Sequence, residues 1–148
     1  MGQDSEYMSL YKNTFNLLGK KFKLGSQNLQ NGVDCFTLII NYLRNRGFNI
    51  PSTETFDGFT FENYGSAYLE DKKKLMQVAI KYLGTKTKKV DASGVTAGDI
   101  LLIESFNGNR SFGIDTGNGF AISISETDGV VSVSKNDFKI LGAFRCLV

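Results

Sequence analysis

A cysteine at the start of a predicted helix is the residue whose type and position best suit chemistry. Cys35 directly follows Asp34, and aspartate is a common helix N-cap because its carboxylate accepts backbone N–H groups that the helix leaves unpaired. We expect Cys35 in the first turn, where the positive end of the helix dipole favours the thiolate over the thiol. This pair of residues therefore predicts a cysteine nucleophile.

The usual partner of such a cysteine is missing, because the chain of 148 residues contains no histidine. Acyl transfer needs a proton for the departing amine, and an imidazolium normally supplies it. Serine hydroxyls have no accessible pKa for this work, and Arg110 cannot exchange protons near neutral pH. We therefore favour a second interpretation, in which Cys35 is a buried residue that packs as a small apolar side chain.

The composition is ordinary for a globular protein and argues against several partners. The chain is 41% hydrophobic and 22% charged, and its net charge of +2 is too small to indicate nucleic acid or an anionic membrane surface. No apolar run reaches the roughly 18 residues that predict a membrane span. The polar, acidic start lacks the basic and apolar regions of a secretion signal, so we expect a protein made in a cytoplasm.

The two cysteines do not predict a disulfide framework or a metal site. Cys35 and Cys146 are too few for such a framework, and without histidine they cannot complete a structural zinc site. The lack of a secretion signal also argues against a disulfide between them. We predict no metal and no other cofactor, and we interpret Cys146 as a free thiol without a role.

The first half of the chain predicts three helices. Apolar spacing predicts the first over residues 6–18 and the second over 35–46, where the buried stripe is wide enough for packing on more than one side. A third helix is predicted over about 65–83. Lysines at 72–74, 86, 88 and 89 are interpreted as a solvated helix face followed by a polar turn, although they could form a basic patch.

Between the second and third helices, residues 52–65 predict an ordered loop. Four aromatic residues are scattered through it, and we expect them to fasten the loop to the core. The alternative is that they line a groove for a peptide or a glycan. These aromatic residues are Phe56, Phe59, Phe61 and Tyr64.

The second half predicts strands joined by short turns. The Asn118-Gly119 step is the strongest hairpin signal, and Asp128-Gly129 joins the next pair. Short turns between consecutive strands predict an antiparallel sheet, so the fold class is α+β, with N-terminal helices packed on a curved C-terminal sheet. We predict one domain over residues 1–148, with a helical part at about 6–84 and a sheet part at about 97–146. The strands are expected at 99–104, 111–116, 120–125, 130–134 and 140–145.

The order of these elements and their motifs resembles the NlpC-type family of papain-like cysteine peptidases. Residues 19–25 (GKKFKLG) resemble the approach to the nucleophile, and Asp34-Cys35 with the apolar run behind it resembles the nucleophile helix. Residues 97–101 (AGDIL) resemble a strand opening that usually begins with proline. Residues 111–119 (SFGIDTGNG) resemble the strand and hairpin that carry the catalytic histidine, and 140–145 (ILGAFR) resemble the last strand.

The resemblance implies a site from which the catalytic histidine is missing. Its place falls on Ser111, two positions before the Gly113-Ile114 step, and a third polar residue of the family falls on Ser123. A shift of one position brings Phe112, which cannot accept a proton either. Asp115 shares a face with Ser111 but lies about 13 Å further along the strand, so we do not expect it to act as a substitute base.

These expectations favour a catalytically inactive domain. Gly32-Val33-Asp34-Cys35 followed by a large apolar residue is more similar to the phage-tail branch of the family than to the secreted hydrolases. The resemblance therefore implies a structural component of a phage tail tip or hub, made in the host cytoplasm and assembled with other tail proteins. One alternative is an active endopeptidase that cuts peptidoglycan stem peptides with a base supplied by Asp115 or a partner. Another is a module that binds peptidoglycan without cutting it.

Overall fold

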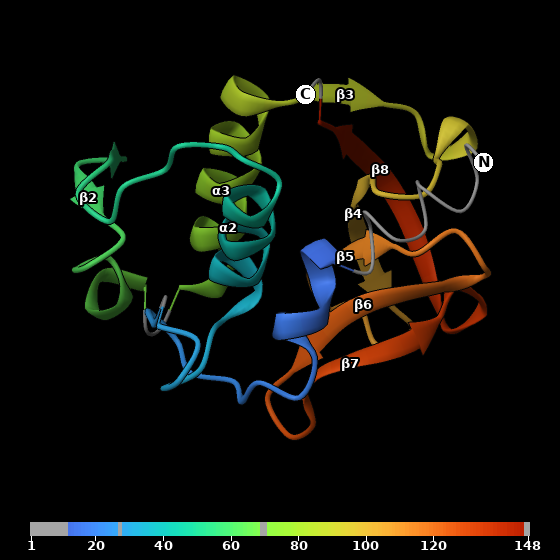
Figure 1. Cartoon of the computed structure of the whole chain (residues 1–148), viewed down its shortest axis with the longest axis horizontal. Coiled ribbons are helices and arrows are strands. Elements are labelled where there is room, and N and C mark those ends of the chain that lie inside the picture. Colours follow the sequence, from blue (N-terminus) through green and yellow to red (C-terminus); the bar gives the residue numbers. More distant parts are fainter. Residues whose placement is uncertain (1–11, 27, 69–70, 147–148) are drawn as a thin grey trace.

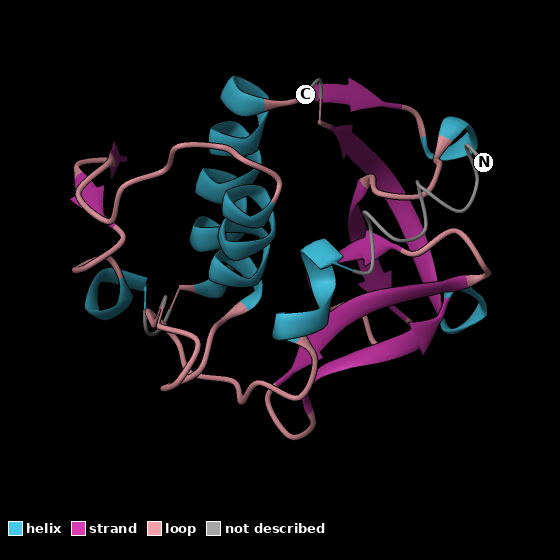
Figure 2. Ribbon diagram, in the orientation of Figure 1, coloured by secondary structure: helices cyan, strands magenta, loops and turns pink. Residues whose placement is uncertain are grey.

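The computed structural model describes residues 12–26, 28–68 and 71–146. Its two long helices lie on one side of the molecule, and the strands of a large sheet lie on the other (Figures 1 and 2). Residues 6–11 of the predicted helix over residues 6–18 lie outside the described residues. Within them, residues 12–14 are helical and are followed by the short 3-10 helix η1 (Phe15–Leu17).

The central helix α2 (Cys35–Asn45) confirms the prediction made from its apolar stripe. Every residue from 36 to 43 is buried, so the helix is enclosed on more than one side, as its wide stripe indicated. It packs against β5 (Arg110–Asp115) and β6 (Phe120–Ser125). The helix ends at the C-cap Arg46, and Gly47 with φ of +102° turns the chain away.

The segment before the last helix differs from its prediction. The expected loop contains a small hairpin of β1 (Thr55–Phe56) and β2 (Phe59–Thr60). The expected helix over 65–83 is divided into η2 (Gly65–Tyr68) and α3 (Lys72–Lys86), because Asp71 accepts the Lys74 N–H and begins a new helix.

The aromatic residues of this segment fasten it to α2, as predicted. The Phe36 ring, in the first turn of α2, has ring centroids of four other aromatic residues within 5.2–6.0 Å. Edge-to-face contacts of this kind stabilise aromatic clusters beyond the area they bury. All four partners are buried, and they are Phe56, Phe61, Tyr64 and Tyr82.

The large sheet is antiparallel, with the strand order β3-β8-β4-β5-β6-β7. The five strands expected from sequence are all present. An additional strand, β3, lies at 88–90, where we predicted a polar turn before the sheet part of the chain. Besides β5 and β6, the large sheet contains β3 (Lys88–Val90), β4 (Ile100–Ser105), β7 (Gly129–Ser134) and β8 (Phe138–Arg145).

The two faces of the sheet bury different clusters. Phe112, Ile114 and Ile122 belong to the main core together with the buried residues of α2. Leu101 and Ile103 belong to a second, smaller cluster. Because successive side chains of a strand point to opposite faces, this division tells which residues of β5 and β6 face the helix.

Candidate active site

The Asp34 carboxylate organises the region around Cys35. The Asp34 side chain is 1% exposed, and its Oδ1 accepts the backbone N–H groups of Phe36 and Thr37 at 2.8 Å each. In return, Thr37 Oγ1 accepts the Asp34 N–H at 2.9 Å and completes a capping box. The predicted N-cap is therefore confirmed.

The second oxygen of the same carboxylate binds groups distant in the sequence. Asp34 Oδ2 accepts the Gly25 N–H at 2.9 Å and the Tyr64 hydroxyl. The Thr37 hydroxyl donates to the Ser26 carbonyl at 2.6 Å. The first turn of α2 is thereby joined to the preceding loop and to the aromatic segment.

This arrangement also depends on two glycines that lie against each other. A Cβ atom on Gly25 would come within 2.7 Å of the Gly65 Cα atom, and Gly25 has φ of +79°. Both the contact and the left-handed backbone exclude a larger residue here.

The Cys35 thiol lies in the first turn, as predicted, and the residue is half-buried where the favoured interpretation expected it to be buried. Its ionisation is the opposite of what the nucleophile interpretation predicted. Desolvation by burial and the neighbouring Asp34 carboxylate together raise the pKa of the thiol to about 12. The backbone N–H groups at the helix start and Lys72 lower this pKa by less. The helix dipole does not dominate because the sulfur is desolvated and because the carboxylate that caps the helix is itself a negative charge beside it. Cys35 is therefore a thiol at neutral pH.

Phe112 points to the face of the sheet that packs against α2. The two serines predicted for the site, Ser111 and Ser123, point to the opposite face. Ser111 pairs with Ile103, and Ser123 pairs with Gly113. Opposed residues in an antiparallel pair point to the same face, which here is the face of the second cluster. The Ser123 hydroxyl donates to the Phe112 carbonyl at 2.8 Å. That Ser111 takes the place of the family histidine stays a prediction.

Asp115 is engaged elsewhere in the sheet. Its side chain is 1% exposed, pairs with Lys135 Nζ at 2.7 Å and accepts the Gly117 N–H at 2.7 Å. These contacts assign Asp115 to the hairpin after β5.

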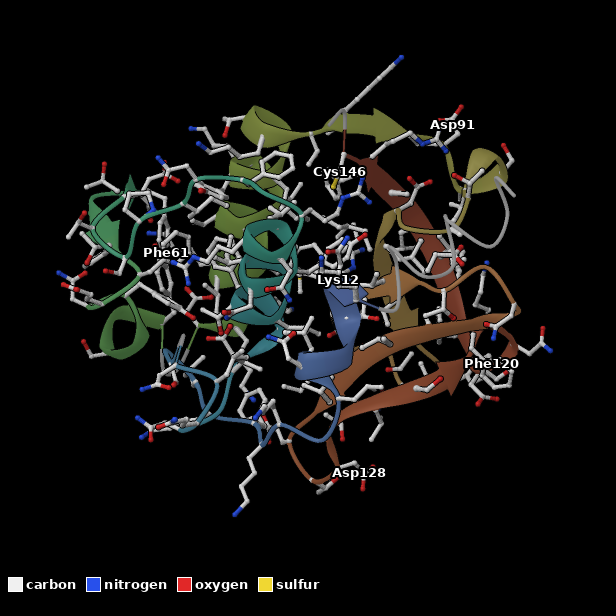
Figure 3. All side chains as sticks on the ribbon, viewed as in Figure 1. Lys12, Phe61, Asp91, Phe120, Asp128 and Cys146 are labelled. Atoms are coloured by element: carbon white, nitrogen blue, oxygen red, sulfur yellow. The ribbon has the colours of Figure 1, made fainter. Side chains whose placement is uncertain are left out.

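The second cysteine is remote from the first. Cys35 begins α2, whereas the thiol pKa of Cys146 responds to Arg46, the C-cap of the same helix. A helix of this length spans about 16 Å, far beyond the reach of a disulfide. Both cysteines are free. Figure 3 shows Cys146 near the end of α3 and the start of β3.

The described residues hold no group of three or more carboxylate or cysteine side chains that could bind a metal ion. No helix in the described part of the chain is long and apolar enough to cross a membrane.

Two neighbours of Cys35 were missed by sequence reasoning. Tyr64 was expected to fasten a loop, but its hydroxyl binds the capping carboxylate. Lys72 was assigned to a solvated face, yet it forms an ion pair with Glu126 and lies close enough to influence the Cys35 thiol. No sequence pattern signals either contact, because both partners are more than 25 residues away.

We expect Asp34→Ala to lower the free energy of unfolding by about 3–5 kcal/mol. It removes a helix cap, worth about 1–2 kcal/mol, and leaves the part-buried Gly25 N–H and the buried Tyr64 hydroxyl unpaired at about 1–1.5 kcal/mol each, near the lower end of the usual range. The matched control is Asp71→Ala, which removes the exposed cap of α3 and should cost about 1 kcal/mol or less. Urea denaturation measures both. Equal losses for the two variants would contradict the role given to Asp34.

Comparison with known proteins places this site in a family. The NlpC/P60 family model matches residues 19–143. No curated protein matches the chain significantly.

Several solved structures share the fold. The NlpC/P60 domain of the peptidoglycan hydrolase SagA is 19% identical, with a TM-score of 0.59 over 93% of this chain and 97% of that one. A Staphylococcus aureus protein of the NLP/P60 family, described as similar to a lipoprotein, is 14% identical, with a TM-score of 0.59 over 98% of this chain and 42% of that one. RipD of Mycobacterium tuberculosis, described as a non-catalytic domain adapted to peptidoglycan binding, is 14% identical, with a TM-score of 0.54 over 93% and 95%.

The matched region contains the capped helix α2 and the cysteine in its first turn. It also contains in full five of the six strands of the large sheet, all except β8. The family model covers most of the sequence, and the solved structures agree with the α+β architecture predicted above. The chain belongs to the NlpC/P60 family.

Proposed function

We propose that this domain is catalytically inactive and acts as an assembly component, part of a phage tail tip or hub. The observation that supports catalytic inactivity is the protonation state of the Cys35 thiol. Its thiol has a pKa of about 12 beside a buried carboxylate, in a chain without histidine. A thiol with this pKa is almost entirely protonated at neutral pH, and the thiolate is the nucleophile.

Besides a thiolate, the cleavage of a peptide bond requires a proton donor. The departing amine must receive a proton, and a group that titrates near neutral pH is the efficient donor. The serines at the predicted partner positions do not titrate in this range, and Asp115 is committed to Lys135. The hydrolase alternative therefore requires a base from another protein.

The assembly role rests on the sequence around the cysteine. In secreted hydrolases of the family a small residue more often follows the cysteine, whereas here Phe36 does, as in the phage-tail branch. Phe36 is fully buried and central to the aromatic cluster, so the first turn of α2 is built for packing. Association with other tail proteins in a virion assembled in a host cytoplasm follows from this resemblance.

Peptidoglycan binding without cleavage is the second candidate. One observation favours it: the fold is shared with RipD, which is described as non-catalytic and adapted to peptidoglycan binding. Binding to cell walls needs no ionised cysteine, so the state of Cys35 is compatible with both roles.

We expect the purified protein to release no products from peptidoglycan or its stem-peptide fragments, and Cys35→Ala to be indistinguishable from wild type. Ser111→His should gain no activity, because residue 111 lies on the sheet face of the second cluster. Chromatography with mass spectrometry of the products measures all three proteins. Turnover in wild type that is lost in Cys35→Ala would overturn the proposal. Turnover only in Ser111→His would instead support inactivity and show that residue 111 reaches the cysteine.

The assembly role is tested in particles and on cell walls. In phage particles purified from the source of the chain, mass spectrometry should find the protein in the tail fraction, and purified cell walls should not retain it. Retention on cell walls together with absence from particles would replace the assembly role with peptidoglycan binding.

A further inference from the structure

The large sheet has two edge strands, and they are protected very differently. At one edge, β3 is only three residues long and carries the exposed Lys88 and Lys89. Short, charged edge strands are a common defence against pairing with other chains. At the other edge, β7 is six residues long, and its sequence GVVSVS contains no charge and no proline. The second edge therefore lacks the short length and the charge that protect the first.

The outer side of β7 has unused hydrogen-bonding groups. Val130 directs its backbone away from β6, because its N–H donates to the Lys20 carbonyl at 2.8 Å and its carbonyl accepts the Gly19 N–H at 2.9 Å. Outward direction alternates along an edge strand, so Ser132 and Ser134 also point outward. Among the residues that the structure describes, no backbone group pairs with these two on that side.

The position of this edge leaves it accessible. Figure 1 shows β7 as the last strand of the sheet, at the lower rim of the molecule beyond β6. In Figure 3, Asp128 in the turn before β7 and Phe120, which pairs with Ser134, mark the two ends of the β6–β7 hairpin. Ser132, between these ends, is exposed. The open groups of Ser132 and Ser134 thus lie in the second half of the strand, where Ser132 is exposed and Ser134 half-buried.

We propose that β7 pairs with β7 of a second copy of this chain, antiparallel, to form one continuous sheet. The pairing centres on Val133, which faces the second copy's Val133 across a twofold axis. In this register the N–H of each Ser132 donates to the carbonyl of Ser134 in the other copy. The N–H of that Ser134 in turn donates to the Ser132 carbonyl. All the outward groups of Ser132 and Ser134 are then paired.

A second copy suits this edge because the strand is complementary to itself. Twofold pairing places Lys135 opposite Val131 and Asp137 opposite Gly129, and every other residue of β7 opposite an uncharged residue, so no two like charges meet. Valine at three of the six positions favours the extended backbone. This inference does not depend on whether Cys35 is catalytic.

The first test is the oligomeric state in solution. Sedimentation of the wild-type protein over a concentration series should show a monomer–dimer equilibrium. Ser132→Pro removes one outward N–H at an edge position where proline is tolerated, and should raise the dissociation constant at least about tenfold. Ser132→Lys adds a charge to the edge and should do the same. Ser132→Thr retains the N–H and should dimerise as wild type does, and circular dichroism confirms that each variant is folded.

A register test uses cysteines in a Cys35→Ser, Cys146→Ser background. Val133→Cys should form an intermolecular disulfide on mild oxidation, because the two residues oppose each other directly. Val131→Cys is the matched control and should remain monomeric on reducing-agent-free gels, because its copies lie about 13 Å apart along the strands. A wild-type protein that is monomeric at every concentration, a dimer unaffected by both Ser132→Pro and Ser132→Lys, or cross-linking through residue 131 alone would overturn the proposal. Binding of a foreign strand to an otherwise monomeric protein would overturn it as well.

Discussion

The buried carboxylate of Asp34 is the interaction on which the candidate site depends. Its two oxygens accept two N–H groups of the first turn of α2, one N–H of the preceding loop and the Tyr64 hydroxyl. A buried charge is tolerated only when it is hydrogen-bonded in this way. The start of α2, the loop and the aromatic segment are therefore stabilised together or lost together.

Desolvation by burial, together with the same carboxylate, determines the ionisation of Cys35. A helix N-terminus attracts negative charge, and in this protein Asp34 already occupies that favourable place. The sulfur is left partly desolvated beside an anion, which opposes its ionisation. Lys72 acts in the opposite direction but lies in an exposed ion pair with Glu126, where solvent weakens its field. The chain contains no histidine, and among the residues that the structure describes, the groups that lower the thiol pKa do not reverse this balance.

Much of the fold could be predicted from local patterns, and the exceptions have physical causes. The stripe of α2 and the strands with hairpin signals follow from spacing along the chain. The β3 strand could not be predicted, because Lys88-Lys89 reads as a polar turn and becomes a strand only by pairing with Arg145 and Phe144 of β8. The β1–β2 hairpin could not be predicted either, because its two strands are too short to show a pattern.

The start of α2 was predictable from the sequence, but its electrostatics and its distant neighbours were not. Asp34 and Cys35 were placed correctly because a cap and a first turn are local features. The thiol pKa depends on burial, and the face of Ser111 depends on the pairing of β5 with β4. Both are properties of tertiary structure that alternation along one strand does not reveal.

The central claim is that Cys35 is a thiol at neutral pH, and its pKa can be measured directly. The protein labelled with 13C at the cysteine Cβ positions, in a Cys146→Ser background, gives one signal whose chemical shift reports ionisation. The account predicts a shift that is constant through neutral pH and begins to change only as the pH approaches about 12. A titration below the ordinary cysteine pKa of about 8.5 would show a stabilised thiolate and contradict the account.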